Sequence, residues 1–293
     1  MPTIVAIWNR LPVVVQALVA GLAAAIVGTG PWAVLSDANI QYWPEVPWAI
    51  VPSALYLWLY WRWIKGAGWP RSTARARRIN ARVNGLSEEA WAAALFAGTL
   101  GLAAVVLTMA VVNRMVRLPE QPTDDLSQVP WFTLVLLLVM TSIVAGVVEE
   151  TSFRGYMQAP IERRHGPIAA ILVTGGSFGL LHFTHPEVTL ALMPYYMAIA
   201  AVYGALAWLT NSILPSAVLH AGGNMLGYID LLTRGRAEWQ ASSVAEPLVW
   251  ETGADASFWI SSAAALAATL AAIAAYVALA RVMRSGRRTP TES

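Results

Sequence analysis

Charged residues are missing from four long stretches of this chain. These stretches lie between Arg10 and Asp37, between Glu89 and Arg114, between Asp125 and Glu149, and between Asp255 and Arg281. A helix of about 20 mainly apolar residues is long enough to cross the hydrocarbon core of a bilayer. Each stretch exceeds that length, so the sequence predicts helices that span a membrane.

The composition excludes the water-soluble classes of protein. Hydrophobic residues make up 57% of the chain and charged residues only 12%. Soluble domains carry about 25% charged residues, so this chain has too little polar surface for a water-soluble globule. The formal net charge of +2 gives no reason to expect nucleic acid as a partner. The chain has no cysteine, which excludes disulfides, thiol nucleophiles and thiolate metal ligands.

Four further spans fit the remaining sequence. One covers residues 46–64, and one lies between residues 164 and 187, where histidines are the only interruption. The uncharged residues from 188 to 229 are too many for one crossing, and Asn211, Ser212 and Pro215 predict a tight turn between two helices there. The predicted fold is therefore all-α, a polytopic membrane protein with about eight transmembrane helices.

Basic residues concentrate in one set of alternate loops. Only four of the 19 Lys and Arg residues fall in the other set, namely Arg114, Arg117, Arg234 and Arg236. Cytoplasmic loops are enriched in Lys and Arg, so an even number of spans places both termini in the cytoplasm. We expect an integral multi-pass protein of the plasma membrane. The basic run from Lys65 to Arg82 could lie on the anionic inner leaflet, but we interpret it as a topology signal.

Ionisable side chains lie inside three of the predicted spans, where each costs about 2.5–3.5 kcal/mol near mid-membrane. They form the patterns EExxxR, FxxxH and HxxxN, at Glu149, Glu150 and Arg154, at Phe178 and His182, and at His220 and Asn224. Because ionisable groups inside a span are costly, we interpret them as candidates for a functional site. Each pattern alone is weak, but three in one chain indicate a site.

Helical spacing pairs only one of the two glutamates. Glu150 and Arg154 are four residues apart, so they lie on one helix face and neutralise each other. Glu149 is rotated by about 100 degrees and cannot share this arginine equally. Burial disfavours the charged form of an unpaired carboxylate, which makes Glu149 a predicted proton acceptor.

The histidine patterns complete a set suited to amide hydrolysis. His220 and Asn224, also four apart, present two side-chain donors to one spot, while Phe178 packs beside His182. Amide hydrolysis needs a base for water, donors for the oxyanion and an acid for the leaving amine. This set supplies all three without cysteine or serine.

The ordered trio of patterns resembles the CPBP family of intramembrane proteases, which includes the type II CAAX prenyl endopeptidases and the bacteriocin-processing and immunity proteins. The resemblance covers residues 131–232, with every motif position filled. It implies a multi-span helical enzyme that cleaves peptide bonds inside or beside the membrane. The roles it implies are water activation by Glu149 and His182, orientation of that pair by Glu150 and Arg154, and oxyanion stabilisation by His220 and Asn224.

The sequence also leads to expectations about a cofactor and about partners. We favour metal-free catalysis because no HExxH is present, with zinc held by Glu149, His182 and His220 as the alternative. The expected partners are the lipid bilayer and a membrane-associated peptide or protein, whether prenylated or not. Two other functions stay open, a proton-coupled transporter and a non-catalytic immunity or scaffold protein.

The chain order predicts three regions. Residues 1–130 hold three spans and a basic cytoplasmic loop at 65–89, residues 131–232 form the CPBP-like core of four spans, and residues 233–293 hold an outer loop, the last span and a basic tail. Straight spans would place Glu149 and His182 at unequal depths. We therefore expect the fourth helix to run well past Arg154, with a cavity open to the cytoplasm, rather than residues 158–167 to re-enter the membrane.

Overall fold

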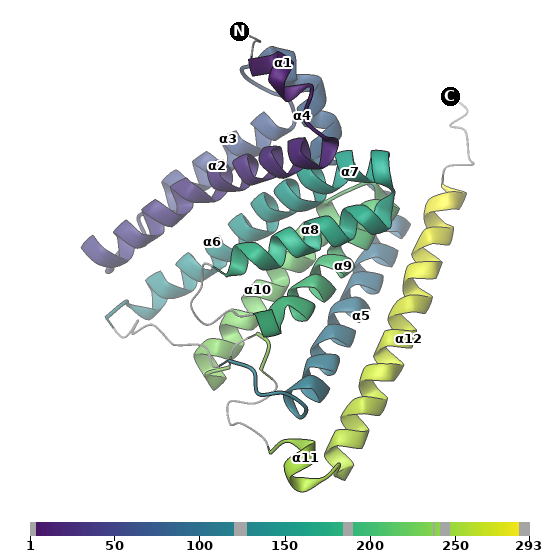
Figure 1. The fold of residues 1–293 in the computed structure, drawn as a ribbon. Coiled ribbons are helices and arrows are strands. Elements are labelled where there is room, and N and C mark those ends of the chain that lie inside the picture. The colour runs from purple at the N-terminus through teal and green to yellow at the C-terminus, as the bar shows by residue number, and fades with distance from the viewer. Residues whose placement is uncertain (1–3, 120–127, 184–189, 237, 241–246, 287–293) are drawn as a thin grey trace. The chain divides into compact units, whose positions relative to one another are not determined.

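The computed structural model describes residues 4–119, 128–183, 190–236, 238–240 and 247–286 (Figure 1). In these residues every regular element is a helix and none is a strand. The long helices are α2 (Val13–Tyr42), α3 (Ile50–Ile64), α5 (Glu88–Asn113), α6 (Trp131–Glu149), α8 (Pro167–His182), α9 (Met193–Thr210), α10 (Leu214–Arg234) and α12 (Ala256–Ser285). The short elements are α1 (Ile4–Trp8), η1 (Arg71–Thr73), α4 (Ala74–Ala81), η2 (Glu150–Met157), α7 (Gln158–His165), η3 (Leu190–Leu192) and α11 (Val249–Thr252).

Five helical stretches are long and apolar enough to cross a membrane. They are Val13–Tyr42, Glu88–Asn113, Trp131–His165, Leu190–Thr210 and Ala256–Ser285. This confirms the prediction of an all-α polytopic membrane protein. The other three predicted spans contain α3, α8 and α10, which do not meet both criteria. The count of eight spans and the cytoplasmic termini stay predictions.

The helix that carries the first motif does not stop at the motif. α6 continues through η2, a π-helix, into α7, so one helical stretch runs from Trp131 to His165. At 1.5 Å per residue, its 35 residues extend about 52 Å, well beyond the roughly 30 Å of bilayer hydrocarbon. The expectation that this helix runs past Arg154 is confirmed, and residues 158–165 are helical rather than a re-entrant loop.

The chain packs into two compact units that alternate along the sequence. The first unit contains Met1–Asn84, Asp125–Thr174 and His220–Met225, and the second contains Gly85–Asp124, Gly175–Leu219 and Leu226–Ser293. This grouping rests on packing, whereas the three predicted regions rest on chain order. The boundaries 1–130, 131–232 and 233–293 stay a prediction.

In the first unit α2 lies against α6 and η2 (Figure 1). Small residues of α2 make this approach possible. A Cβ atom on Gly21 would lie 2.2 Å from the side chain of Met157 and 2.9 Å from the backbone oxygen of Ser152. Only glycine therefore lets the backbone of α2 come this close to the π-helix, which fixes the position of the motif segment.

Helix α4 supports the same segment within the first unit. A Cβ atom on Gly155 would lie 2.8 Å from the backbone oxygen of Asn80, so α4 and η2 are in near-backbone contact. Just after α4, Arg82 forms a largely buried ion pair with Glu162 of α7, with one nitrogen–oxygen distance of 3.0 Å. The predicted basic loop is thus partly a folded support for the motif helix.

The second unit is built on α5, α9 and α12 (Figure 1). Its helix ends carry the caps that the sequence favours: Ser87 accepts the N–H of Ala90, and Asp255 accepts the N–H of Phe258. The predicted turn between α9 and α10 is confirmed, with Asn211 in the left-handed conformation at φ 49°. Such backbone angles are uncommon outside glycine, and asparagine is among the residues that tolerate them.

Candidate active site

Glu149 ends α6, and the other two residues of the first motif, Glu150 and Arg154, lie on a π-helix that is buried throughout. Every residue of η2, from Glu150 to Met157, is shielded from solvent in the structure. π-Helical segments are rare and occur mostly within α-helices at functional sites. This π-helix was not predicted, because hydrophobic periodicity cannot distinguish two helix types along an almost wholly apolar stretch.

Glu150 is the centre of a buried hydrogen-bonded group in the first unit. Arg154 donates Nη1–H to Oε1 of Glu150 at 2.8 Å, as the spacing of the motif predicts. His220, which is 70 residues away in the sequence, donates Nδ1–H to the same oxygen at 2.9 Å. All three side chains are almost fully buried. A buried carboxylate is stable only when it is paired and hydrogen-bonded, and this one has both partners.

Glu149 has different surroundings from its neighbour. Its side chain is 26% exposed, and among the described residues it makes no hydrogen bond. The nearest ionisable partner is His220, whose Nε2 lies 3.6 Å from Oε2 of Glu149. Because Nδ1 of that imidazole is directed at Glu150, a single ring faces both carboxylates. When Nε2 carries a proton, the positive imidazolium attracts the Glu149 carboxylate.

Asn224 lies one turn after His220 on α10, also within the first unit. It is half-buried, and its amide makes no hydrogen bond with the part of the chain that the structure describes. An amide in this state has two N–H groups to offer a ligand. The structure therefore places Glu149, Glu150, Arg154, His220 and Asn224 in one unit, with His220 in direct contact with both glutamates.

His182 lies in the second unit at the end of α8. Its Nδ1–H donates to the backbone oxygen of Phe178 at 2.8 Å, which makes Nε2 the ring atom that carries the lone pair. The Phe178 ring packs beside the imidazole at 4.6 Å, as expected. On another side the ring of Tyr196 stacks on the imidazole at 4.3 Å and 27°.

Tyr196 is a residue that sequence reasoning missed. It is one of nine tyrosines in the chain, and it follows His182 by 14 residues on a different helix, so no spacing rule connects the two. Its neighbour Tyr195 packs edge-on against it, with ring centroids 5.3 Å apart. The histidine is therefore held by a small aromatic cluster of α8 and α9.

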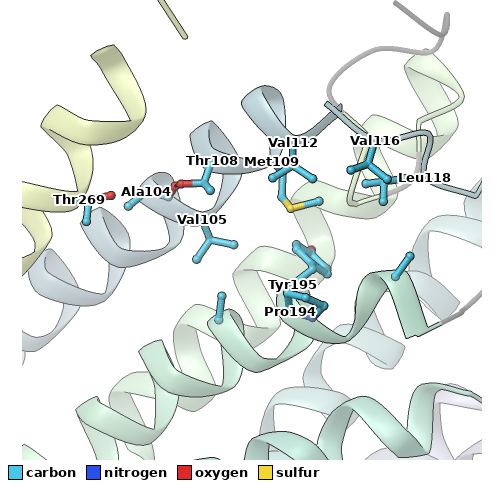
Figure 2. Close-up of a pocket in the computed structure, with 12 residues that line it drawn as sticks. Ala104, Val105, Thr108, Met109, Val112, Val116, Leu118, Pro194, Tyr195 and Thr269 are labelled. Atoms are coloured by element: carbon cyan, nitrogen blue, oxygen red, sulfur yellow. The ribbon is translucent and has the colours of Figure 1, made fainter. Parts of the chain in front are cut away.

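An apolar hollow of about 440 Å³ lies beside this cluster in the second unit. Met109 of α5 and Tyr195 of α9 approach it from opposite sides (Figure 2). Its threonines, Thr108 and Thr269, donate to carbonyls of their own helices, and the Tyr195 hydroxyl donates to the backbone oxygen of Glu238, so the lining presents little polarity. One aromatic ring, Tyr195, thus connects the hollow to the rings around His182.

The zinc alternative has no support from the geometry within either unit. In the described ranges no group of three or more histidine, aspartate or glutamate side chains is arranged to hold a metal ion. The predicted zinc ligands Glu149 and His220 belong to the first unit and His182 to the second. The zinc set stays a prediction, and no step below depends on a metal.

Comparison with known families decides the class of the protein. Residues 130–226 match the model of the Rce1-like family, described as type II CAAX prenyl endopeptidase Rce1-like. This segment belongs to the Rce1-like CAAX protease family. The match confirms the resemblance predicted from the motifs and covers nearly the same residues. Comparisons with curated proteins and with solved structures found no match.

The match to the Rce1-like family indicates a general activity. The match at residues 130–226 supports a hydrolase of the CAAX-type intramembrane protease class, and the five long apolar helices support an integral membrane protein. All three motifs lie inside the matched segment, which ends two residues after Asn224. The contribution of each motif residue to the reaction is the subject of the proposal that follows.

Proposed function

We propose that this chain hydrolyses a peptide bond in a membrane-associated protein or peptide, with Glu149 as the base that activates water. The observation that carries the proposal is the contrast between two adjacent glutamates. Glu150 is buried and bound by Arg154 and His220, whereas Glu149 is partly exposed and makes no hydrogen bond among the described residues. Glu149 is therefore the carboxylate that can take a proton from water.

The reaction then follows from ordinary acid–base chemistry. Glu149 accepts a proton as the water oxygen attacks the peptide carbonyl carbon, and the carbonyl oxygen becomes an oxyanion. Asn224 donates its amide N–H to this oxyanion, and a protonated Nε2 of His220 donates alongside it. When the carbon–nitrogen bond breaks, Glu149 returns its proton to the leaving amine.

Glu150 and Arg154 have a positioning role in this scheme. They hold the Nδ1 side of His220, so its Nε2 is directed toward Glu149. In this proposal His182, the histidine of the FxxxH motif, helps Glu149 to activate the water. Its Nδ1 proton is engaged by Phe178, and Nε2 is the atom able to accept a proton.

The substrate we propose carries an apolar group near the cleaved bond. The description of the family that residues 130–226 match names prenyl endopeptidases. A prenyl or other lipid chain on a membrane-associated peptide is therefore the substrate class to examine first. The plasma membrane is the proposed location, which membrane fractionation tests.

The experiment uses the purified full chain in proteoliposomes with farnesylated and unmodified CAAX-terminated peptides. Glu149→Gln should abolish cleavage, and Asn224→Ala should lower the rate by about 100-fold or more, as expected for loss of one oxyanion donor. Glu251→Gln is the matched control, because Glu251 is an exposed acid outside the motifs that pairs with exposed Arg117 and accepts the N–H of Leu248. Full activity of correctly inserted Glu149→Gln would refute the assignment.

The same assay separates metal-free from zinc-dependent catalysis. With Glu149 as a proton acceptor and no metal, chelator treatment should leave the rate unchanged, and metal analysis should find no stoichiometric zinc. Zinc at one atom per chain, with activity that is lost on its removal and restored by its return, would instead favour the metal set of Glu149, His182 and His220.

A further inference from the structure

The basic residues from the end of α3 to the start of α5 have no role in the proposed reaction. Seven of them lie between positions 62 and 82, namely Arg62, Lys65, Arg71, Arg75, Arg77, Arg78 and Arg82. No acidic residue occurs between Glu45 and Glu88 to balance them. The structure shows that these seven residues fall into two groups with different surroundings.

Two of the seven hold the fold together. Arg77 is buried, donates to the backbone oxygens of Ala67 and Pro70, and lies over the ring of Trp63 at 4.7 Å. Arg82 is buried in its ion pair with Glu162. Their charges are satisfied inside the first unit, so they are not available to a partner.

The other five are exposed and make no ion pair with any described residue. Three of them, Arg71, Arg75 and Arg78, lie on η1 and on the outer side of α4. Two large apolar side chains are exposed in the same segment, with Trp69 at 85% and Ile79 at 51% of full exposure. We call Trp69, Arg71, Arg75, Arg78 and Ile79 the basic face.

The opposite side of α4 is firmly packed. Ala81 is buried, Gly155 of η2 approaches the backbone at Asn80, and the side-chain oxygen of Asn80 accepts from Arg163 at 2.7 Å. The basic face is therefore displayed from a supported helix rather than from a loose loop. Ordered arginines lose less entropy on binding than mobile ones, which favours recognition of a ligand.

We propose that the basic face binds the headgroups of anionic phospholipids at the bilayer surface. Arginine guanidinium groups match phosphate in charge and in hydrogen-bond geometry. An exposed tryptophan beside them suits the polar–apolar boundary of a membrane, where Trp is enriched. A signal that only orients the chain needs positive charge in a loop and does not require a packed helix, an exposed Trp69 and an exposed Ile79 on one segment.

The absence of cysteine provides a direct test on the full-length protein. An Ile79→Cys variant carries a single thiol, so a bimane fluorophore can be attached at the basic face alone. The labelled protein is placed in nanodiscs that contain brominated phosphatidylglycerol or brominated phosphatidylcholine. We expect stronger bimane quenching by the anionic lipid, and we expect this preference to fall in high salt.

Three further variants, made in the labelled protein, distinguish the proposal from a general charge effect. Arg71→Gln, Arg75→Gln and Arg78→Gln together should lower the phosphatidylglycerol preference by about tenfold or more, since each surface charge contributes about fivefold. The same three positions changed to Lys should keep only part of it, because an ammonium group keeps the charge but lacks the hydrogen-bond geometry of a guanidinium. Arg281→Gln with Arg284→Gln, which removes two exposed arginines from α12, should leave it unchanged.

Two results would overturn the proposal. One is equal quenching by the two lipids in the parent protein. The other is a preference that survives the loss of the three arginines, which would leave them with an orienting function only. Because the readout is lipid contact rather than cleavage, failure of the protease proposal would not alter either result.

Discussion

At the scale of single residues, one imidazole faces both glutamates of the first motif. His220 donates from Nδ1 to the buried Glu150, and its Nε2 lies 3.6 Å from the partly exposed Glu149. Arg154 completes the charge balance around Glu150. Removing Glu150 or Arg154 would leave an uncompensated buried charge, which is strongly destabilising. Their loss should therefore reduce folding as well as activity, whereas loss of Glu149 should affect activity alone.

Tyr196 gives a prediction about a residue that lies outside the three motifs. Its ring stacks on His182, so it should position the imidazole through its face rather than through its hydroxyl. Tyr196→Phe should keep near-normal cleavage, while Tyr196→Leu should lower kcat by about tenfold with little change in KM. The measurement is steady-state kinetics in proteoliposomes, with thermal melting to show that both variants are folded. Equal kinetics for the two variants would remove the positioning role.

At the scale of elements, α2 and α4 fix the π-helix through close backbone contacts. Gly21 and Gly155 permit these contacts because larger side chains would meet Ser152 and Asn80. The sequence spacing predicted the Glu150–Arg154 pair, since both ends lie on one helix. The contact of His220 with the glutamates joins residues 70 positions apart, and no local pattern encodes a separation of that length. Its discovery required the packed structure.

A pair of glycine variants tests the close approach. In an ordinary helix, replacing glycine by alanine stabilises the folded state by about 1 kcal/mol. Gly155→Ala should instead destabilise the protein, by about 1–3 kcal/mol for overpacking, and should lower cleavage because η2 must shift. Gly30→Ala on α2, where a Cβ atom meets nothing within 4 Å, is the control and should not destabilise. The measurement is the melting temperature of both variants in the same detergent. Equal melting temperatures would contradict the close packing of Gly155 against α4.

The junction of α5 and α12 has a predicted dependence on pH. Hydrogen bonds from Arg114 and then from the N–H of Phe258 hold the pKa of Asp255 below its usual value. A carboxyl whose pKa is lowered by folding stabilises the folded state above its usual pKa, and this contribution disappears as the pH falls through the lowered value. Asp255→Asn keeps the helix cap but removes the charge.

The measurement is the melting temperature of wild type and Asp255→Asn across acidic pH. Wild type should melt higher at neutral pH, and the difference should shrink as Asp255 becomes protonated. Asp37→Asn, which removes an exposed acid that forms no ion pair with any described residue, controls for the loss of one charge. A difference that is the same at pH 7 and pH 3 would show that Asp255 acts only as a helix cap.

At the scale of the whole molecule, the sequence determined the class of fold more fully than the details of the site. Charge-free stretches predicted the membrane helices because the bilayer requires long apolar segments, and all eight predicted spans contain a helix. Composition could not reveal the π-helix or the stacking of Tyr196 on His182, because apolar helices have no strong periodicity to read. Three short motifs nevertheless indicated the family that residues 130–226 match.

The most direct test of peptide-bond hydrolysis by Glu149 is a comparison of newly formed protein termini in membranes. Cells that express wild type and cells that express equal amounts of inserted Glu149→Gln are analysed by mass spectrometry of terminal peptides. If Glu149 is the catalytic base, some cleavage products of membrane-associated proteins will occur with wild type and be missing with Glu149→Gln. Identical sets of termini in the two membranes, with both proteins correctly inserted, would contradict hydrolysis by this carboxylate.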